Sequence, residues 1–162
     1  MKKALMFFTV LTVITGLFGC SYQKNVLGVL SIPCELRAVE LSTETEFLLK
    51  ASSEGFECEI LAPQAVSGTK LKYDGVCTVT VGDFERECER EDFASVCSLE
   101  KAIRLLNENR DSITFTATYC QYTIDGMTVL VYYEEKGKAV ASIITQENGK
   151  QFEYRINNEA QS

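Results

Sequence analysis

The sequence predicts an α+β fold: a long, curved antiparallel β-meander sheet, half-barrel-like, with one main covering helix. Two observations predict it. Turn pairs ending in glycine recur between runs rich in β-branched and aromatic residues, at Glu54-Gly55, Asp74-Gly75, Asp125-Gly126, Lys136-Gly137 and Asn148-Gly149. Asp-Gly and Asn-Gly suit two-residue hairpins, because both positions accept positive φ. In addition, one segment stands out for its helical spacing of apolar residues, and a helix set against such a sheet defines the α+β class.

Each element follows from its local pattern. Strands are expected at 34–41, 45–51, 56–62, 69–74, 76–82, 112–124, 127–135, 138–147 and 150–157. The helix is expected over 98–109, with Ser98 as its N-cap and an apolar face of Leu99, Ala102, Ile103, Leu105 and Leu106.

Alternation within the last strands indicates which faces are covered. The run 150–157 alternates apolar and charged residues, whereas 127–133 carries apolar side chains on both faces. A strand that is apolar on both faces is covered twice or lines a cavity. The residues of a candidate apolar groove are Tyr122, Leu130, Tyr132 and Ile144. The alternative is a fully packed core without a ligand.

The N-terminus carries a targeting pattern. Lys2-Lys3 precede an apolar run, Ala4–Phe18, whose 15 residues would span about 22 Å as a helix, short of the ~30 Å bilayer core. The run ends in Leu17, Phe18, Gly19 and Cys20, which resembles the bacterial lipobox, although Phe18 stands where a small or β-branched residue is usual. An uncleaved anchor helix is the alternative.

The lipobox resemblance implies a domain organisation. Residues 1–19 are a lipoprotein signal peptide, 20–33 a lipidated Cys20 with a polar tether, and 34–158 a single β-rich domain. Two acyl chains on Cys20 are enough for stable membrane anchoring without a spanning helix. The expected location is therefore the extracytoplasmic face of a bacterial membrane, with the diacylglyceryl group on Cys20 as the link to the lipid.

A second resemblance rests on the order of elements. The Pro-x-x-Val-x-Gly turn at Pro63–Gly68, the mid-chain helix and the final meander resemble small bacterial lipoproteins with a lipoprotein-carrier-like (LolA-like) sheet. That resemblance implies a half-barrel over an apolar cavity, which holds acyl chains in the carriers. The present chain is shorter than those carriers and lacks an obvious N-terminal helix.

Composition excludes several functions. The 162 residues carry a formal charge of −7, which repels nucleic acid, and the chain has no histidine and no tryptophan. Histidine-based triads and histidine-ligated metals are thus excluded. We expect a non-enzymatic protein without cofactor or metal that binds an apolar ligand or an envelope protein. The alternative is a structural or protein-interaction module.

Six cysteines follow Cys20, a number that suggests up to three disulfides in an exported domain. The expected pairs are Cys88 with Cys97, which are close in sequence, and Cys58 with Cys77, which lie on strands joined by one turn segment. Cys34 and Cys120 are expected to be buried thiols. The charged run 85–92 mixes Glu and Arg and is expected to be a solvated, salt-bridged loop, since it lacks the spacing of a calcium site.

Overall fold

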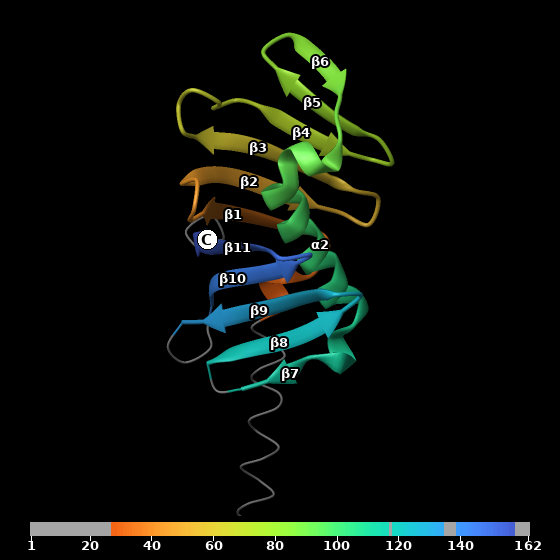
Figure 1. Cartoon of the computed structure of the whole chain (residues 1–162), viewed down its shortest axis with the longest axis vertical. Coiled ribbons are helices and arrows are strands. Elements are labelled where there is room, and N and C mark those ends of the chain that lie inside the picture. The colour runs from red at the N-terminus through yellow and green to blue at the C-terminus, as the bar shows by residue number, and fades with distance from the viewer. Residues whose placement is uncertain (1–26, 117, 135–138, 158–162) are drawn as a thin grey trace, which may run out of the picture.

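The computed structural model describes residues 27–116, 118–134 and 139–157. These residues form one eleven-stranded antiparallel sheet, in the order β6-β5-β4-β3-β2-β1-β11-β10-β9-β8-β7, and one α-helix (Figure 1). The strands are β1 (Cys34–Glu40), β2 (Thr45–Ala51), β3 (Phe56–Ala62), β4 (Lys70–Tyr73), β5 (Cys77–Val81), β6 (Phe84–Glu87), β7 (Thr114–Phe115), β8 (Tyr119–Ile124), β9 (Met127–Tyr133), β10 (Val140–Glu147) and β11 (Lys150–Asn157). The α+β class and the antiparallel sheet with one helix are confirmed.

The sheet consists of two meanders joined at its centre. Strands β1 to β6 follow one another, the helix comes next, and β7 to β11 form the second meander. The last strand pairs with the first, with Ala38 opposite Ile156 and Glu40 opposite Tyr154. The sheet is open, with β6 and β7 at its two edges.

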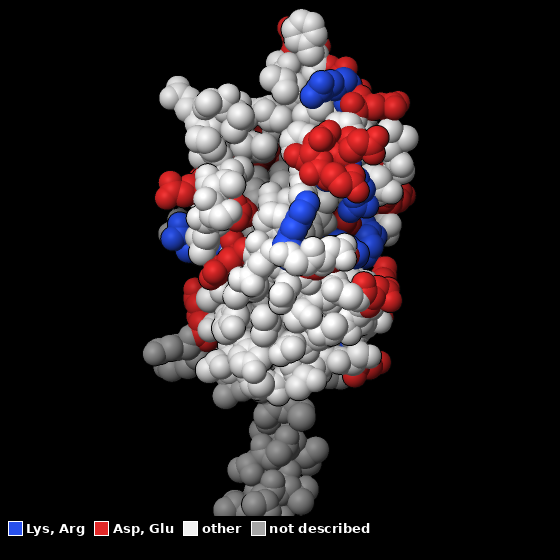
Figure 2. Space-filling model, in the orientation of Figure 1, with Lys and Arg blue, Asp and Glu red and all other residues white. Residues whose placement is uncertain are grey.

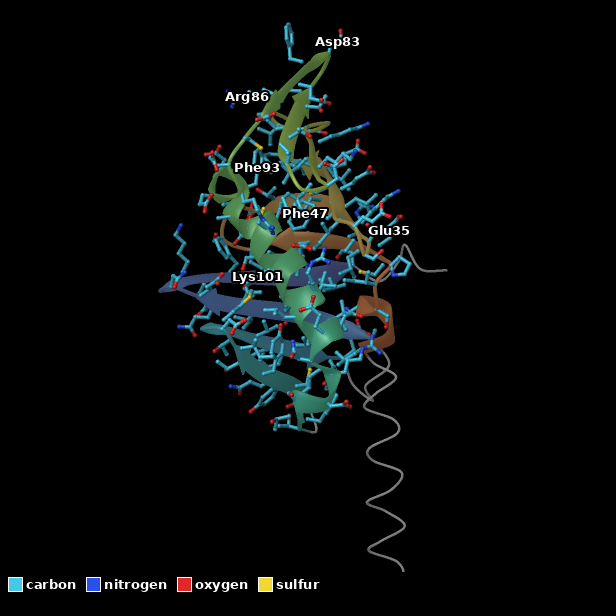
Figure 3. The ribbon with its side chains drawn as sticks, turned by 90° about the vertical axis from the view of Figure 1, so that its right-hand side faces the viewer. Glu35, Phe47, Asp83, Arg86, Phe93 and Lys101 are labelled. Atoms are coloured by element: carbon cyan, nitrogen blue, oxygen red, sulfur yellow. The ribbon has the colours of Figure 1, made fainter. Side chains whose placement is uncertain are left out.

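The helix α2 (Ala94–Glu108) lies across one face of the sheet, which we call the inner face (Figures 1 and 3). It begins four residues before the predicted start, and Ser98 is not its N-cap but a residue within it, bonded through Oγ to Thr145 Oγ1 at 2.7 Å. The reason is the preceding 3₁₀ turn η2 (Arg90–Phe93). The Asp92 carboxylate caps the start of this turn, because it accepts a hydrogen bond from the Glu89 N–H.

Two predicted segments differ in detail. The predicted strand 112–124 is divided into β7 and β8, because Thr116 makes a tight turn and donates from Oγ1 to the Tyr119 carbonyl at 2.7 Å. A short 3₁₀ turn, η3 (Arg110–Ser112), precedes β7. The run 85–92 is solvated as expected, but it is not a loop, since Phe84–Glu87 forms the edge strand β6 and Arg90–Phe93 forms η2.

Two predicted hairpin turns have the backbone that their sequence favours. Asp125 and Gly126 both have positive φ, as do Asn148 and Gly149. Gly55 is required for another reason, because a Cβ there would lie 1.7 Å from the Tyr73 carbonyl oxygen. The turn at Lys136-Gly137 lies outside the described residues.

The core lies between α2 and the inner face of the sheet. Its largest fully buried side chains include Tyr154, Phe47, Leu36, Leu49, Leu99, Ile103 and Leu106. The C-terminal part of the expected tether belongs to this core. Residues Leu27–Leu30 form the 3₁₀ turn η1, and both of its terminal leucines are buried.

Asn107, near the end of α2, holds η1 in place. Its Nδ2 donates to the Leu30 carbonyl at 2.6 Å, and its Oδ1 accepts from the Ile32 N–H at 3.1 Å. The two leucines, three residues apart on a single turn, are both buried in the core and tie this segment to the domain. Among the described residues, no helix combines the length and apolar character that crossing a bilayer requires.

Candidate functional site

Four apolar side chains lie together on the sheet face opposite α2, which we call the outer face. We define this outer patch as Tyr119, Leu130, Tyr132 and Ile144. The register places Tyr119 opposite Tyr132 and Leu130 opposite Ile144, and the two tyrosine ring centroids are 5.6 Å apart. All four side chains are half-buried. The surface over β8, β9 and β10 shows few charged side chains (Figure 2).

Three of the four predicted groove residues belong to this patch, and one does not. Leu130, Tyr132 and Ile144 lie on the outer face, whereas Tyr122 lies on the inner face, where its hydroxyl donates to the Ala102 carbonyl at 2.9 Å. Tyr122 and Leu130 have opposite orientations because Tyr122 is paired with Val129, the residue before Leu130. Tyr119 was missed. Tyr119 lies beside Tyr132 because of the register between β8 and β9, which the sequence of β8 alone does not predict.

On the inner face, side chains of β8 to β11 pack into the core. Cys120, Val129, Val131, Ile143 and Tyr154 are fully buried there. Tyr154 is also held by polar contact, since its hydroxyl donates to the Ser95 carbonyl of α2 at 2.6 Å. The apolar surplus that the sequence shows on these strands is therefore left on the outer face.

Several surface hollows on the described residues lie away from the outer patch. One of about 640 Å³ is lined by the ends of β1 to β4, including the half-buried Cys34 and Tyr73 and the buried Phe56. Another, of about 520 Å³, runs along α2 and the β10–β11 turn and contains Arg104 and Glu147. Both linings are rich in charged side chains, unlike the outer patch.

A second exposed apolar pair lies at the tip of the β5–β6 hairpin. Phe84 is 84% exposed and its cross-strand partner Val81 is 57% exposed. Figure 3 shows Asp83 and Arg86 on the same hairpin, beyond the start of α2. This hairpin and η1 are associated with opposite ends of α2, since η2 precedes the helix and Asn107 lies near its end.

The charged groups nearest the core are engaged with each other. Glu100 of α2 is buried and accepts from Arg90 at 3.1 Å and from Arg104 at 2.6 Å. The Arg90 guanidinium also lies over the Tyr73 ring, 4.5 Å from its centroid. Burial disfavours the Arg90 cation, yet the neighbouring Cys97 and Glu100 raise the pKa of Arg90 above its ordinary value. The cluster joins η2, α2 and β4, so its geometry indicates a structural role.

The cysteines are not paired as predicted. All six described cysteines are free thiols, so Cys88 is not joined to Cys97, nor Cys58 to Cys77. The reason is β6, which places Cys88 beside Cys77, with the two Sγ atoms 3.4 Å apart. Cys120 is buried as expected, while Cys34 is half-buried. Within the described ranges, no group of three or more cysteine or acidic side chains is placed to hold a metal ion.

The lipobox residues Leu17, Phe18, Gly19 and Cys20 lie outside the described residues. A comparison of the sequence with protein-family models and with curated proteins finds no match. The functional assignment therefore depends on the residues of this chain.

Proposed function

We propose that this protein is a lipid-anchored, non-enzymatic lipoprotein on the extracytoplasmic face of a bacterial membrane, and that it binds an envelope component through its outer patch. The observation that carries the binding part is the position of Tyr119, Leu130, Tyr132 and Ile144 on the sheet face that α2 leaves uncovered. The anchoring part rests on the lipobox pattern at Cys20.

The packing of η1 supports a location close to the membrane. Leu27 is buried in the core and lies seven positions after Cys20 in the sequence. A fully extended chain of that length spans at most about 25 Å. A domain tied to Cys20 would therefore stay within one domain diameter of the lipid surface, where other envelope components lie.

The non-enzymatic assignment is supported by the state of the buried carboxylates. The sequence has no histidine, so acid–base chemistry would fall to carboxylates or thiols. Glu100 is neutralised by two arginines and Glu40 accepts four hydrogen bonds from Ser42 and Thr43. Both side chains are committed to local structure.

The closed inner face favours a surface partner over a ligand held inside the sheet. The resemblance to lipoprotein-carrier-like domains implies a helix-covered antiparallel sheet, and more specifically a sheet that curves into a half-barrel. In those carriers the cavity lies beneath the covering helices. Here the corresponding space is filled by side chains such as Phe47 and Ile103. We therefore place the binding surface on the other face of the sheet.

A photo-crosslinking residue at position 130 of the full-length protein tests the proposal in cells. We expect a covalent adduct with an envelope component at position 130, and none at position 80, an outer-face position of β5 outside the outer patch. Replacement of Cys20 with Ala, followed by labelled fatty acid, tests the anchor in the same strain. Equal adducts at both positions, or none at 130, would contradict the outer patch as the binding surface. Labelling of the Cys20→Ala variant would contradict the anchor.

A further inference from the structure

Cys77 and Cys88 face each other at the base of the β5–β6 hairpin. The last strand pair is Thr78 with Glu87, so Cys77 and Cys88 are the next residues in register. The Cys88 N–H donates to the Cys77 carbonyl oxygen at 3.0 Å, and the two Sγ atoms are 3.4 Å apart. Opposed residues of an antiparallel pair have Cα atoms about 4.5–5.5 Å apart, within the range that a disulfide spans.

We propose that Cys77 and Cys88 form a structural disulfide in the exported protein. The proposal rests on the proposed extracytoplasmic location, because thiols are kept reduced in the cytosol and are oxidised outside it. The bond closes the base of the edge hairpin. It differs from the pairing that the sequence favours, in which Cys88 joins Cys97.

The oxidation is balanced by a disulfide-bearing oxidant. The Cys88 thiol, which is half-buried, loses its proton and attacks one sulfur of the oxidant's disulfide, and the other sulfur leaves as a thiolate. Cys77 then loses its proton and attacks Cys88 Sγ in the mixed disulfide, which releases the oxidant's second thiolate. The two cysteines lose two protons and two electrons, and the oxidant becomes a dithiol.

The surroundings suit a structural bond rather than a catalytic dithiol. Burial, followed by the contact with Cys88, raises the pKa of Cys77 to about 12, and burial also raises the pKa of Cys97. A thiol of high pKa is a poor leaving group in thiol–disulfide exchange, so attack on the closed bond that would release Cys77 is slow. The bond also lies where other support is weakest, since all four residues of β6 are exposed and β5 is its one paired strand.

Cys97 is the competing partner, and its contacts oppose that pairing. Its sulfur is hydrogen-bonded to the Arg90 side chain, which is itself held by Glu100. Cys88, in contrast, already makes backbone and sulfur contacts with Cys77. The two pairings predict different covalent products.

Tryptic mapping distinguishes them, because cleavage after Lys72, Arg86, Arg90 and Lys101 separates the three cysteines into peptides 73–86, 87–90 and 91–101. Full-length protein is made in a bacterium with its own N-terminal segment, acid-quenched, alkylated without reductant and digested. We expect peptide 73–86 linked to 87–90, and alkylated Cys97 in 91–101. A link between 87–90 and 91–101, or full alkylation of Cys88 in protein cleaved before Cys20, would overturn the proposal.

The cleavage state of the N-terminus in the same sample distinguishes a failure of the disulfide proposal from a failure of the proposed extracytoplasmic location. If the protein is uncleaved and fully alkylated, export has failed, and oxidised glutathione applied to the purified full-length protein then decides the pairing. Failure of the 73–86/87–90 link to form there would overturn the proposal as well.

A stability measurement checks the structural role. Reductant should lower the melting temperature of the wild-type protein by about 5–10 °C, as expected for a short closed loop in a domain of this size. It should leave Cys88→Ser unchanged, while the matched variant Cys120→Ser, altered at a buried cysteine of β8, should respond as the wild type does. Equal effects of reductant on wild type and Cys88→Ser would contradict the role.

Discussion

The carboxylate of Glu40 is buried at the end of β1 and closes the turn to β2. Its oxygens accept hydrogen bonds from the backbone and hydroxyl groups of Ser42 and Thr43. Burial opposes the charge, but these four bonds outweigh it and hold the pKa of Glu40 below its ordinary value. The buried carboxylate at the end of β1 thus accepts the hydrogen bonds that the β1–β2 turn donates.

This arrangement predicts an acid-dependent loss of stability. Because the folded-state pKa lies below the unfolded value of about 4.3, the contribution is complete above about pH 5 and disappears as the pH falls through the folded-state pKa. Glu40→Gln should lower the free energy of unfolding by about 1–2 kcal/mol at pH 7 and by less at pH 3. Urea unfolding at the two pH values measures this.

The matched control is Glu57→Gln, at an exposed position of β3. Its effect on the free energy of unfolding should be within about 0.5 kcal/mol at pH 7. An equal loss in the two variants, or a loss for Glu40→Gln that grows at low pH, would contradict the role of the Glu40 bonds.

At the residue scale, much of the inner face could be predicted from the sequence, and contacts between distant segments could not. The alternation of Phe152, Tyr154 and Ile156 correctly predicts one face of β11. The contact of Arg90 with Glu100 and Tyr73 has no such signal, because it joins η2 to a helix and a strand that no sequence period relates.

At the scale of elements, Gly55 shows how the β2–β3 turn and the β3–β4 pairing depend on one close backbone approach. A side chain at Gly55 would meet the Tyr73 carbonyl oxygen, which lies at the end of β4. That oxygen is backbone and does not move without shifting the strand. We therefore predict that Gly55→Ala lowers the free energy of unfolding by about 2–3 kcal/mol or more.

Gly28→Ala is the matched control, since a Cβ there meets nothing within 4 Å. It should change the stability by less than about 1 kcal/mol, as measured by the same denaturant titration. If Gly55→Ala changed the free energy of unfolding as little as Gly28→Ala does, the β3–β4 pair could shift to make room for the Cβ, which would contradict this prediction.

Strands and turns could be predicted from the sequence where the residues of a single turn determine its backbone conformation. The pairs Asp125-Gly126 and Asn148-Gly149 specify their hairpins through positive φ at both positions. The start of α2 and strand β6 were missed because the charged run 85–92 has no apolar alternation. Its structure is set by pairing with β5 and by the Glu89–Asp92 turn.

At the scale of the whole molecule, we expect the two faces of the sheet to differ in how well they tolerate an introduced charge. Leu130 and Val131 are neighbours on β9, but Leu130 is half-buried on the outer face and Val131 is fully buried beneath α2. We predict that Leu130→Glu keeps the fold with a loss of about 1 kcal/mol, because its carboxylate can stay hydrated. Val131→Glu should unfold the domain, since an unpaired buried carboxylate costs several kcal/mol.

Thermal unfolding followed by circular dichroism measures both variants. Unfolding of Leu130→Glu to the same extent as Val131→Glu would mean that the outer patch is part of a closed core. In that case the patch would have no free surface to offer a partner.

The strand order as a whole was beyond sequence reasoning for a physical reason. Within each meander, turns join consecutive strands and specify their pairing, but β1 and β11 are separated by nearly the whole domain and no turn relates them. Their register depends on side-chain fit across the centre of the sheet, such as the edge-to-face contact of Phe47 with Tyr154.

That central pairing ties the assembly of the sheet to the order in which the chain is made. Since β11 lies between β1 and β10, the two halves are joined by the described strand that comes latest in the sequence. Long-range pairing of this kind forms slowly, because the closure of a long loop precedes any gain from contacts. During synthesis, β1 and β10 would each expose an unpaired edge until residue 157 has emerged. A chain truncated before Lys150 would keep those two edges open for good, and such edges are sites of aggregation.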